Sequence, residues 1–263
     1  MREKEQLLEV AMSAAVKAGN FLLEHSEDFL KVSQKESLRD IVTEIEKCAE
    51  KEIIKILKDY SHCYPILTEE SGIISGKKSK KKNYWIVDPL DGTVNYVNRI
   101  PFYAVSVAFV EKESPLVGVV YSPPLNSLYF GAKGIGVYKN HTKIKVKDQK
   151  PTECLFAVTF SGKKYNSATR KEEFIMFEKV NDSTRGCLRT GSAAMNLSYL
   201  AEGKLGGSWG RLNKIWDIAA GLLLAELAGA TIEYKVASTE KNLVSYIATV
   251  PSAWNFIKKR VRL

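Results

Sequence analysis

Cysteine is scarce in this sequence of 263 residues, and its few cysteines are irregularly spaced. The four are Cys48, Cys63, Cys154 and Cys187. Their spacings match neither a zinc-binding pattern nor a disulfide framework. We therefore interpret them as ordinary reduced thiols.

Long hydrophobic runs are also lacking. The longest apolar stretch, from Ile218 to Ala230, is interrupted by Glu226 and two glycines. It is shorter than the roughly 20 residues that a membrane-spanning helix needs. The first residues, Met1 to Gln6, lack the apolar core of a secretory signal. We expect a cytoplasmic protein without a membrane partner.

Acidic residues are fewer than basic ones, 30 against 39, which gives a net charge of +9. Much of the excess lies in one lysine run at positions 77 to 82. Such a run is usually solvated surface, although it also attracts anionic substrates. We do not expect nucleic acid as a partner. The three histidines, His25, His62 and His141, lie outside every motif described below, and we interpret them as surface or packing residues.

Hydrophobic periodicity divides the chain into two parts. Apolar residues three and four apart predict helices near residues 7–21 and 40–58, with Val42, Ile45, Ala49, Ile53 and Leu57 facing inward. Short apolar, β-rich runs are expected at 64–68, 84–87, 104–110, 116–121, 127–130, 136–138, 155–160 and 230–234. Helices are expected at 171–180, 193–202 and 218–228. The pattern predicts an α+β subdomain with an antiparallel sheet over 1–147 and an α/β subdomain over 148–263.

The densest polar motif follows a buried strand. Trp85-Ile-Val leads into Asp88-Pro-Leu-Asp-Gly-Thr-Val-Asn, so Asp88, the Leu90 carbonyl and Asp91 point at one small volume. Ligands that are all oxygen atoms suit a hard cation such as Mg²⁺ rather than zinc. Two aspartates at a turn are equally well explained as local caps. This motif alone leaves both explanations open.

Two further carboxylate motifs lie at element ends. Glu69 and Glu70 follow a short strand, and because neighbouring strand residues face opposite ways, at most one should face a metal. Asp217 opens an apolar helix, where capping the helix is the more common role of an isolated aspartate. Neither motif alone indicates a metal site.

Taken together, these motifs resemble the inositol monophosphatase family of lithium-sensitive, metal-dependent sugar phosphatases. The resemblance rests on Glu69-Glu70-Ser71, Asp88-Pro-Leu-Asp-Gly-Thr-Val-Asn-Tyr and Trp216-Asp217-Ile-Ala-Ala-Gly, supported by Asp40-Ile-Val-Thr and Arg189-Thr-Gly-Ser-Ala-Ala. It covers nearly the whole chain. It implies a layered α-β-α-β-α sandwich with the site where the two halves meet, and commonly a homodimer.

The resemblance also assigns roles to residues. Metal ligands for two or three Mg²⁺ would be Glu69, Asp88, the Leu90 carbonyl, Asp91 and Asp217. Catalytic roles would fall on Thr93, Glu46 and Glu69. Substrate contacts would come from Asp91, Gly92, Thr93, Gly191, Ser192, Ala193 and Asp217. The Gly191–Ala193 segment is otherwise explained as a small-residue turn into a helix.

Two positions depart from the family pattern. Glu46 stands where the family usually has an aspartate that relays a proton from the threonine. Gly210 stands where inositol-specific members carry a glutamate that contacts ring hydroxyls. We expect Gly210 to leave room for a larger substrate, and Arg211 to reach a second phosphate. The substrate is therefore less certain than the reaction.

The expected function is Mg²⁺-dependent hydrolysis of a small sugar or polyol phosphate, with inositol-1-phosphate as the first substrate to test. The alternative substrate is fructose-1,6-bisphosphate, either alone or together with inositol phosphate. A non-enzyme alternative is an RNA- or transcription-associated binding protein, which the basic composition favours.

Overall fold

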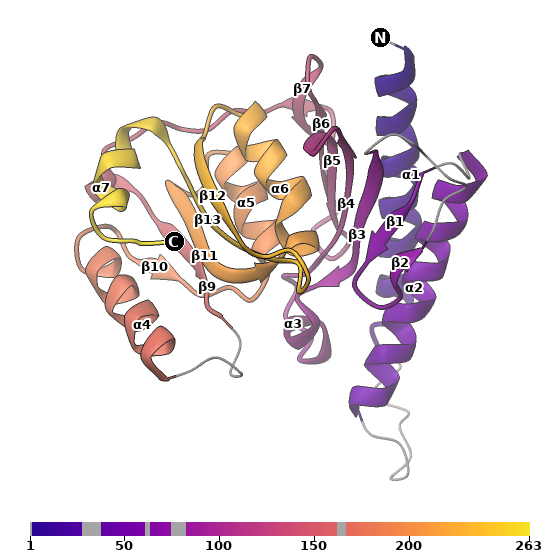
Figure 1. Cartoon of the computed structure of the whole chain (residues 1–263), viewed down its shortest axis with the longest axis horizontal. Helices are drawn as coiled ribbons and strands as arrows, with labels where there is room; N and C mark the ends of the chain where they lie inside the picture. The colour runs from indigo at the N-terminus through magenta and orange to yellow at the C-terminus, as the bar shows by residue number, and fades with distance from the viewer. Residues whose placement is uncertain (1, 28–37, 61–63, 75–82, 162–166) are drawn as a thin grey trace.

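The computed structural model shows helices and sheets in alternating layers (Figure 1). It describes residues 2–27, 38–60, 64–74, 83–161 and 167–263, without the side chains of residues 2 and 38–43. The side chains of the Asp40-Ile-Val-Thr motif, that of Val42 included, lie outside the described part, as do His62, Cys63 and the lysine run. No helix in the described ranges is long and apolar enough to cross a membrane.

The elements follow one another as two series. The helices are α1 (Arg2–Glu24), α2 (Leu38–Tyr60), α3 (Thr93–Val97), α4 (Ser167–Asn181), α5 (Ala193–Ala201), α6 (Ile215–Leu227) and α7 (Trp254–Lys258), with 3₁₀ turns at Pro151–Glu153 and Pro251–Ala253. The strands are β1 (Ile66–Thr68), β2 (Gly72–Ile74), β3 (Tyr84–Asp91), β4 (Ala104–Glu111), β5 (Ser114–Ser122), β6 (Ser127–Ala132), β7 (Gly136–Lys139), β8 (Thr142–Lys143), β9 (Phe156–Thr159), β10 (Cys187–Leu188), β11 (Gly207–Lys214), β12 (Thr231–Ser238) and β13 (Leu243–Thr249).

The outer layer consists of α1 and α2, which pack on each other and on the first sheet. The predicted apolar face of α1 is confirmed, because Ala11, Ala14 and Ala18 are fully buried. On α2, Ile53 and Leu57 are fully buried as well. The alanines let the helix backbone lie close to the sheet.

The first sheet has the order β2-β1-β3-β4-β5-β6-β7-β8, in which β1 and β3 are parallel and the other neighbours antiparallel. Alternate residues of β3 face different layers. Trp85 and Val87 pack in the core with α1 and α2, and Ile86 packs with α5 and α6. Because helices cover both faces, β3 is almost wholly apolar until its polar end.

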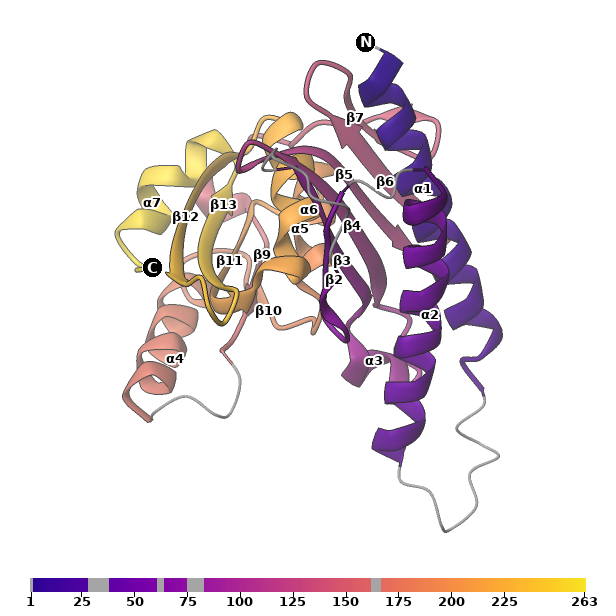
Figure 2. The ribbon, with the colours of Figure 1, turned by 45° about the vertical axis from the view of Figure 1, so that its right-hand side comes forward.

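The central layer consists of α5 and α6, which lie between the two sheets (Figure 2). Helix α6 is apolar on nearly all sides, as expected for a helix with no solvent-facing side. At Gly118 of β5, a Cβ would lie 3.0 Å from the backbone oxygen of Ala220. A glycine there allows α6 to pack directly against the sheet.

The second sheet has the order β10-β9-β11-β13-β12, and α4 and α7 lie beyond it. The α-β-α-β-α sandwich is thus confirmed. Strands β11 and β13 were not predicted as separate elements. All first-sheet strands precede residue 144, and all second-sheet strands follow residue 155. The division into subdomains at residue 147 remains a prediction.

Candidate metal centre

A β-bulge turns the end of β3 into a polar loop. Asp88 pairs with Ser106 of β4, and the next pair is Asp91 with Ala104, so β3 has one extra residue at this point. Pro89 falls in the bulge, where its missing N–H costs no ladder hydrogen bond. The Leu90 N–H donates to Asp88 Oδ1 at 2.9 Å. Asp88 therefore has the local capping role that its sequence allows, and this role uses only one of its two carboxylate oxygens.

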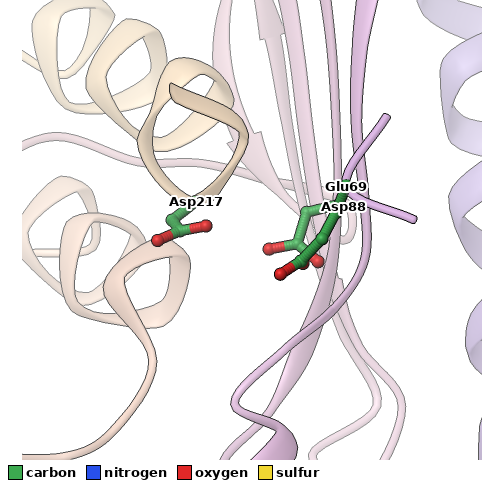
Figure 3. Close-up of side chains that lie close together, drawn as sticks. All are labelled: Glu69, Asp88 and Asp217. Atoms are coloured by element: carbon green, nitrogen blue, oxygen red, sulfur yellow. The ribbon is translucent and has the colours of Figure 1, made fainter. Parts of the chain in front are cut away.

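Three carboxylates from separate elements converge (Figure 3). Ligand oxygens of Glu69, Asp88 and Asp217 all lie within 4.8 Å of one another. Glu69 follows β1 and Asp88 lies in the C-terminal half of β3. These strands are parallel neighbours, so their carboxyl ends share one sheet edge. Asp217 approaches from the first turn of α6. The spatial cluster thus depends on the fold rather than on sequence spacing.

Asp217 also supports its own helix. Lys214 is the N-cap of α6, and Asp217 stands three residues later. Its carboxylate accepts a hydrogen bond from the Lys214 backbone, as the third residue of a capping box does. The capping and ligand roles predicted as alternatives are therefore compatible.

Asp91 lies beside the cluster and binds the start of α5. Its Oδ2 accepts hydrogen bonds from Ser192 Oγ at 2.6 Å and from the Ala194 N–H at 2.7 Å. Ser192 is the N-cap of α5, and its Oγ also accepts from the Met195 N–H. Asp91 therefore joins the first sheet to the central layer. Any metal contact would use its other oxygen.

Thr93 connects the loop after β3 to α2. Its Oγ1 lies 2.7 Å from Glu46 Oε1, to which it donates, and 3.3 Å from the Leu90 carbonyl oxygen. Gly92 precedes it with φ of 105°, a conformation that favours glycine. The structure thus brings together the two residues that the sequence had assigned to proton relay.

The carboxylates of the cluster repel one another when they are ionised. Burial raises the pKa of Asp88 and Asp217 well above the usual range, and neighbouring carboxylates raise both further. Glu69 lies at the solvent-facing rim, yet crowding by protein atoms raises its pKa to about 7, against a hydrogen bond with Asp88. The positive charge of Lys214 lowers the pKa of Glu69 and Asp217. A bound cation would relieve the remaining repulsion.

Burial also raises the pKa of two carboxyls next to the cluster. That of Glu46 is raised to about 7, although the hydrogen bond from Thr93 opposes the change. That of Asp91 is raised to about 6, against the hydrogen bonds from Ser192 and α5. Glu46 thus has the pKa expected of a proton acceptor working near neutral pH.

The donor set fits Mg²⁺. The converging atoms are all carboxylate oxygens, and in the described ranges no histidine or cysteine joins them. Hard cations prefer such ligands. The assignment of Glu69, Asp88, the Leu90 carbonyl, Asp91 and Asp217 as ligands remains a proposal.

Glu50 is a feature that the sequence reasoning missed. This residue of α2 is only 1% exposed. It accepts a hydrogen bond from the Glu70 N–H at 3.0 Å and another from Ser71 Oγ. It therefore fixes the turn that presents Glu69, while Glu70 stays out of the cluster. The sequence places Glu50 one helical turn after Glu46, but its burial and its partners appear only in the tertiary structure.

Comparison with known sequences decides the family. The sequence model of the "Inositol monophosphatase family" matches residues 3–248. The chain belongs to this family.

Similar proteins differ in the functions that their names state. The chain is 36% identical over 239 residues to "Fructose-1,6-bisphosphatase/inositol-1-monophosphatase" of Aquifex aeolicus, covering 87% of this chain and 86% of that protein. It is 38% identical over 233 residues to "Nus factor SuhB" of Vibrio cholerae, covering 86% and 84%. The solved inositol monophosphatase of Anabaena (Nostoc) superposes with a TM-score of 0.84 at 28% identity, covering 97% and 95%.

The Gly191–Ala193 segment, which the resemblance led us to expect in contact with substrate, makes internal contacts. Gly191 has φ of 92° and starts the turn into α5. Ser192 uses its hydroxyl for Asp91 and for the helix cap. Ala193 is buried, being 2% exposed. Substrate contacts by Gly191, Ser192 and Ala193 remain a proposal.

The expectation that Gly210 leaves room for a larger substrate is wrong. A Cβ at Gly210 would lie 2.0 Å from Asn213 Oδ1 and 2.9 Å from the Tyr246 ring. These side chains fill the space, because the bulge in β11 folds Asn213 back over the glycine.

Arg211 has a partner away from the carboxylates. Its Nη1 donates to Glu172 Oε2 of α4 at 2.8 Å. This ion pair would have to open before Arg211 could bind a substrate phosphate. The contact of Arg211 with a substrate phosphate therefore remains a prediction, and it carries the free-energy cost of breaking this ion pair.

Proposed function

We propose that this member of the inositol monophosphatase family is a Mg²⁺-dependent phosphomonoesterase for a small sugar or polyol phosphate. The observation that carries the proposal is the convergence of Glu69, Asp88 and Asp217 within 4.8 Å. The adjoining Thr93–Glu46 contact of 2.7 Å supplies a proton acceptor. Inositol-1-phosphate is the first substrate.

The proposed chemistry divides between ligands and relay. Glu69, Asp88, the Leu90 carbonyl, Asp91 and Asp217 would hold Mg²⁺. When bound, the ions would supply positive charge that favours ionisation of water and neutralises the phosphoryl and leaving oxygens. Gly92 and Thr93 would contact the phosphate and orient the attacking water.

Hydrolysis then needs a proton relay from the attacking water to the protein. The water oxygen forms a bond to phosphorus as the bond from phosphorus to the sugar oxygen breaks. The water proton passes to Thr93 Oγ1, while the Thr93 proton passes to Glu46, to which Thr93 already donates. The departing sugar oxygen takes a proton from solvent water, and Glu46 returns its proton to solvent, so the products are the sugar hydroxyl and inorganic phosphate. A histidine, serine or cysteine nucleophile is not required.

The deciding experiment is a panel of phosphate esters assayed with Mg²⁺. Inositol-1-phosphate and fructose-1,6-bisphosphate are compared at steady state, each with and without Li⁺, for which we expect inhibition. The name of the Aquifex aeolicus relative favours the bisphosphate as a second substrate. Absence of turnover on the whole panel would reject the proposal.

The variant Asp88→Asn tests the metal assignment with a side chain of equal size. We expect kcat to fall by on the order of 10³-fold, comparable with loss of another preorganised charge-stabilising group. The fold should persist, because a neutral amide of equal size relieves repulsion at a buried carboxyl. Circular dichroism and metal-free melting check this. Near-normal turnover in a folded variant contradicts the metal assignment.

A second candidate is a binding function. The Vibrio cholerae relative has the name Nus factor, and the net charge of +9 suits a polyanionic partner. RNA binding that weakens steeply with salt, in a chain without phosphatase activity, would favour it.

A homodimer, which we propose from the family, is tested by light scattering after gel filtration.

A further inference from the structure

A cavity of about 280 Å³ lies between α4, β11 and the C-terminal residues. It shares no lining residue with the carboxylate cluster. Its polar lining consists of Lys179, Arg211, Lys259, Arg260, Arg262 and Glu172; we call these six residues the basic pocket. They come from three segments far apart in the sequence, which the second sheet and α4 bring together at one end of the molecule (Figure 1).

Positive charge in the basic pocket is poorly balanced. Its single carboxylate, Glu172, is paired with Arg211 at 2.8 Å. Within the described ranges, no carboxylate lies at ion-pair distance from Lys179, Lys259, Arg260 or Arg262. Like charges gathered around a concave surface repel one another and raise the local concentration of anions. An anion in the cavity would supply the missing counter-charge.

The identity of the cations favours phosphate. The chain has 9 arginines among its 39 basic residues, whereas three of the five cations of the basic pocket are arginines. Arginine binds phosphate through two parallel N–H donors, which lysine cannot do. The composition of the pocket therefore differs from that of the lysine-rich surface as a whole.

Part of the basic pocket is already ordered by the protein. The Arg260 guanidinium lies 3.7 Å from the centre of the Phe256 ring, and its Nη1 donates to the Phe256 carbonyl at 3.1 Å. The Arg262 N–H donates to Met176 Sδ of α4 at 3.3 Å, which fixes the C-terminal residues against that helix. A ligand would meet preorganised donors, which lowers the entropic cost of binding.

The size of the cavity indicates a small ligand. About 280 Å³ is close to the lower end of the range for small-molecule sites, and a nucleic-acid strand would need an extended basic track. Four unbalanced positive charges match a ligand with two or more anionic groups. We propose that the basic pocket binds a small molecule with at least two phosphate groups. The proposal does not depend on the phosphatase function.

The test is a calorimetric titration of the full chain with inorganic pyrophosphate in a buffer containing EDTA. Without divalent cations, the carboxylate cluster repels an anion, so saturable binding reports the basic pocket. We expect one site per chain. Lys259→Gln/Arg262→Gln should raise Kd at least about tenfold, because each substitution removes a charge-assisted hydrogen bond to the ligand. Within the described structure, the side chains of both residues make no hydrogen bond or ion pair, so the fold should persist.

The control variant is Lys51→Gln/Lys55→Gln, which makes the same change of charge on α2 at the opposite outer layer. It should leave Kd within about twofold. Binding that is absent, or weakened equally by both double variants, would overturn the proposal. So would a single-stranded 12-nucleotide RNA that binds more tightly than pyrophosphate and loses its binding in Lys259→Gln/Arg262→Gln. Melting curves of both variants verify that they are folded.

Discussion

At the scale of single residues, position 46 suits a side chain as long as that of glutamate. Glu46 extends from α2 to Thr93 Oγ1 at 2.7 Å. Burial raises its pKa to about 7, and the charges of Glu70 and Glu69 add to the rise. The aspartate that the resemblance led us to expect here would be one methylene shorter. Glu46 is therefore the residue whose replacement best tests the proposed proton transfer.

We expect Glu46→Gln to lower kcat by about 10²- to 10⁴-fold, the range that one general base contributes. KM should change little, because Glu46 does not contact the substrate in the proposed arrangement. Wild-type kcat should rise with pH as Glu46 ionises, and bound Mg²⁺ should move this rise below pH 7. Steady-state rates across pH measure both effects. A pH limb unchanged in Glu46→Gln would show that another group is the base.

Glu50 permits a test of positioning without chemistry. Glu50→Ala removes both hydrogen bonds to the turn that presents Glu69. We expect Mg²⁺ affinity to fall about 10- to 100-fold, as for other groups that orient ligands. Glu50→Gln keeps one acceptor oxygen and should recover part of the loss. Calorimetric Mg²⁺ titration is the measurement, and Glu52→Ala on the same helix is the control, expected to bind normally.

At the scale of elements, β11 shows how a short irregularity positions the site. Its pairing with β13 shifts between Gly210 and Asn213. Leu212 has φ of 54° there, and its N–H donates to Ser245 Oγ at 3.1 Å. The bulge lies just before α6, whose N-cap residue is Lys214 and whose first turn carries Asp217. A substitution at Gly210 should therefore lower the stability of the fold before it alters any substrate contact.

Gly210→Ala should destabilise the protein by about 1–3 kcal/mol, the usual cost of overpacking. The new Cβ would lie 2.0 Å from Asn213 Oδ1, so one of the two must move. Asn213→Ala should recover much of the loss when combined with Gly210→Ala. Alone it should cost less, because Asn213 Oδ1 is buried without a hydrogen-bond partner. Denaturant unfolding of the two single variants and the double variant gives the coupling energy. Additive effects would exclude the clash.

The elements that the sequence predicted well are those with a clear period. Helix α1 repeats apolar residues three and four apart, and the helix covers that region. Strand β11 was missed because Gly207 and Gly210 weaken β-propensity and its first four residues are buried without alternation. The carboxylate cluster needed the family resemblance, because parallel pairing of β1 with β3 cannot be read from spacing. Glu50 needed the tertiary contact itself.

At the scale of the whole molecule, the carboxylate cluster links stability to pH and to metal. The pKa values of Glu46 and Glu69 are both raised from 4.5 to about 7. The folded state therefore holds more protons than the unfolded state between these values. The stabilisation from these groups is complete below about pH 4.5 and is lost as pH rises through 7. Metal binding requires the ionised carboxylates and should oppose this loss.

We expect the Tm of the metal-free protein to be lower at pH 8 than at pH 5.5. Mg²⁺ should raise Tm more at pH 8, where the ligands are ionised. Glu46→Gln should show a smaller difference in metal-free Tm between the two pH values, since it removes one raised pKa. Thermal melting of both proteins under the four conditions is the measurement. An equal difference in wild type and variant would exclude Glu46 as a source of the pH dependence.

The central helices have a consequence for biosynthesis. The inner face of the first sheet, including Ala104, Ala108 and Tyr129, packs against Ala220 and Leu224 of α6. During synthesis, the strands of the first sheet are therefore made before the helix that covers them. Until α6 emerges, the nascent chain exposes an apolar face that chaperones recognise. Asp217 arrives with the same helix, so burial of that face and assembly of the carboxylate cluster occur in one late step of synthesis.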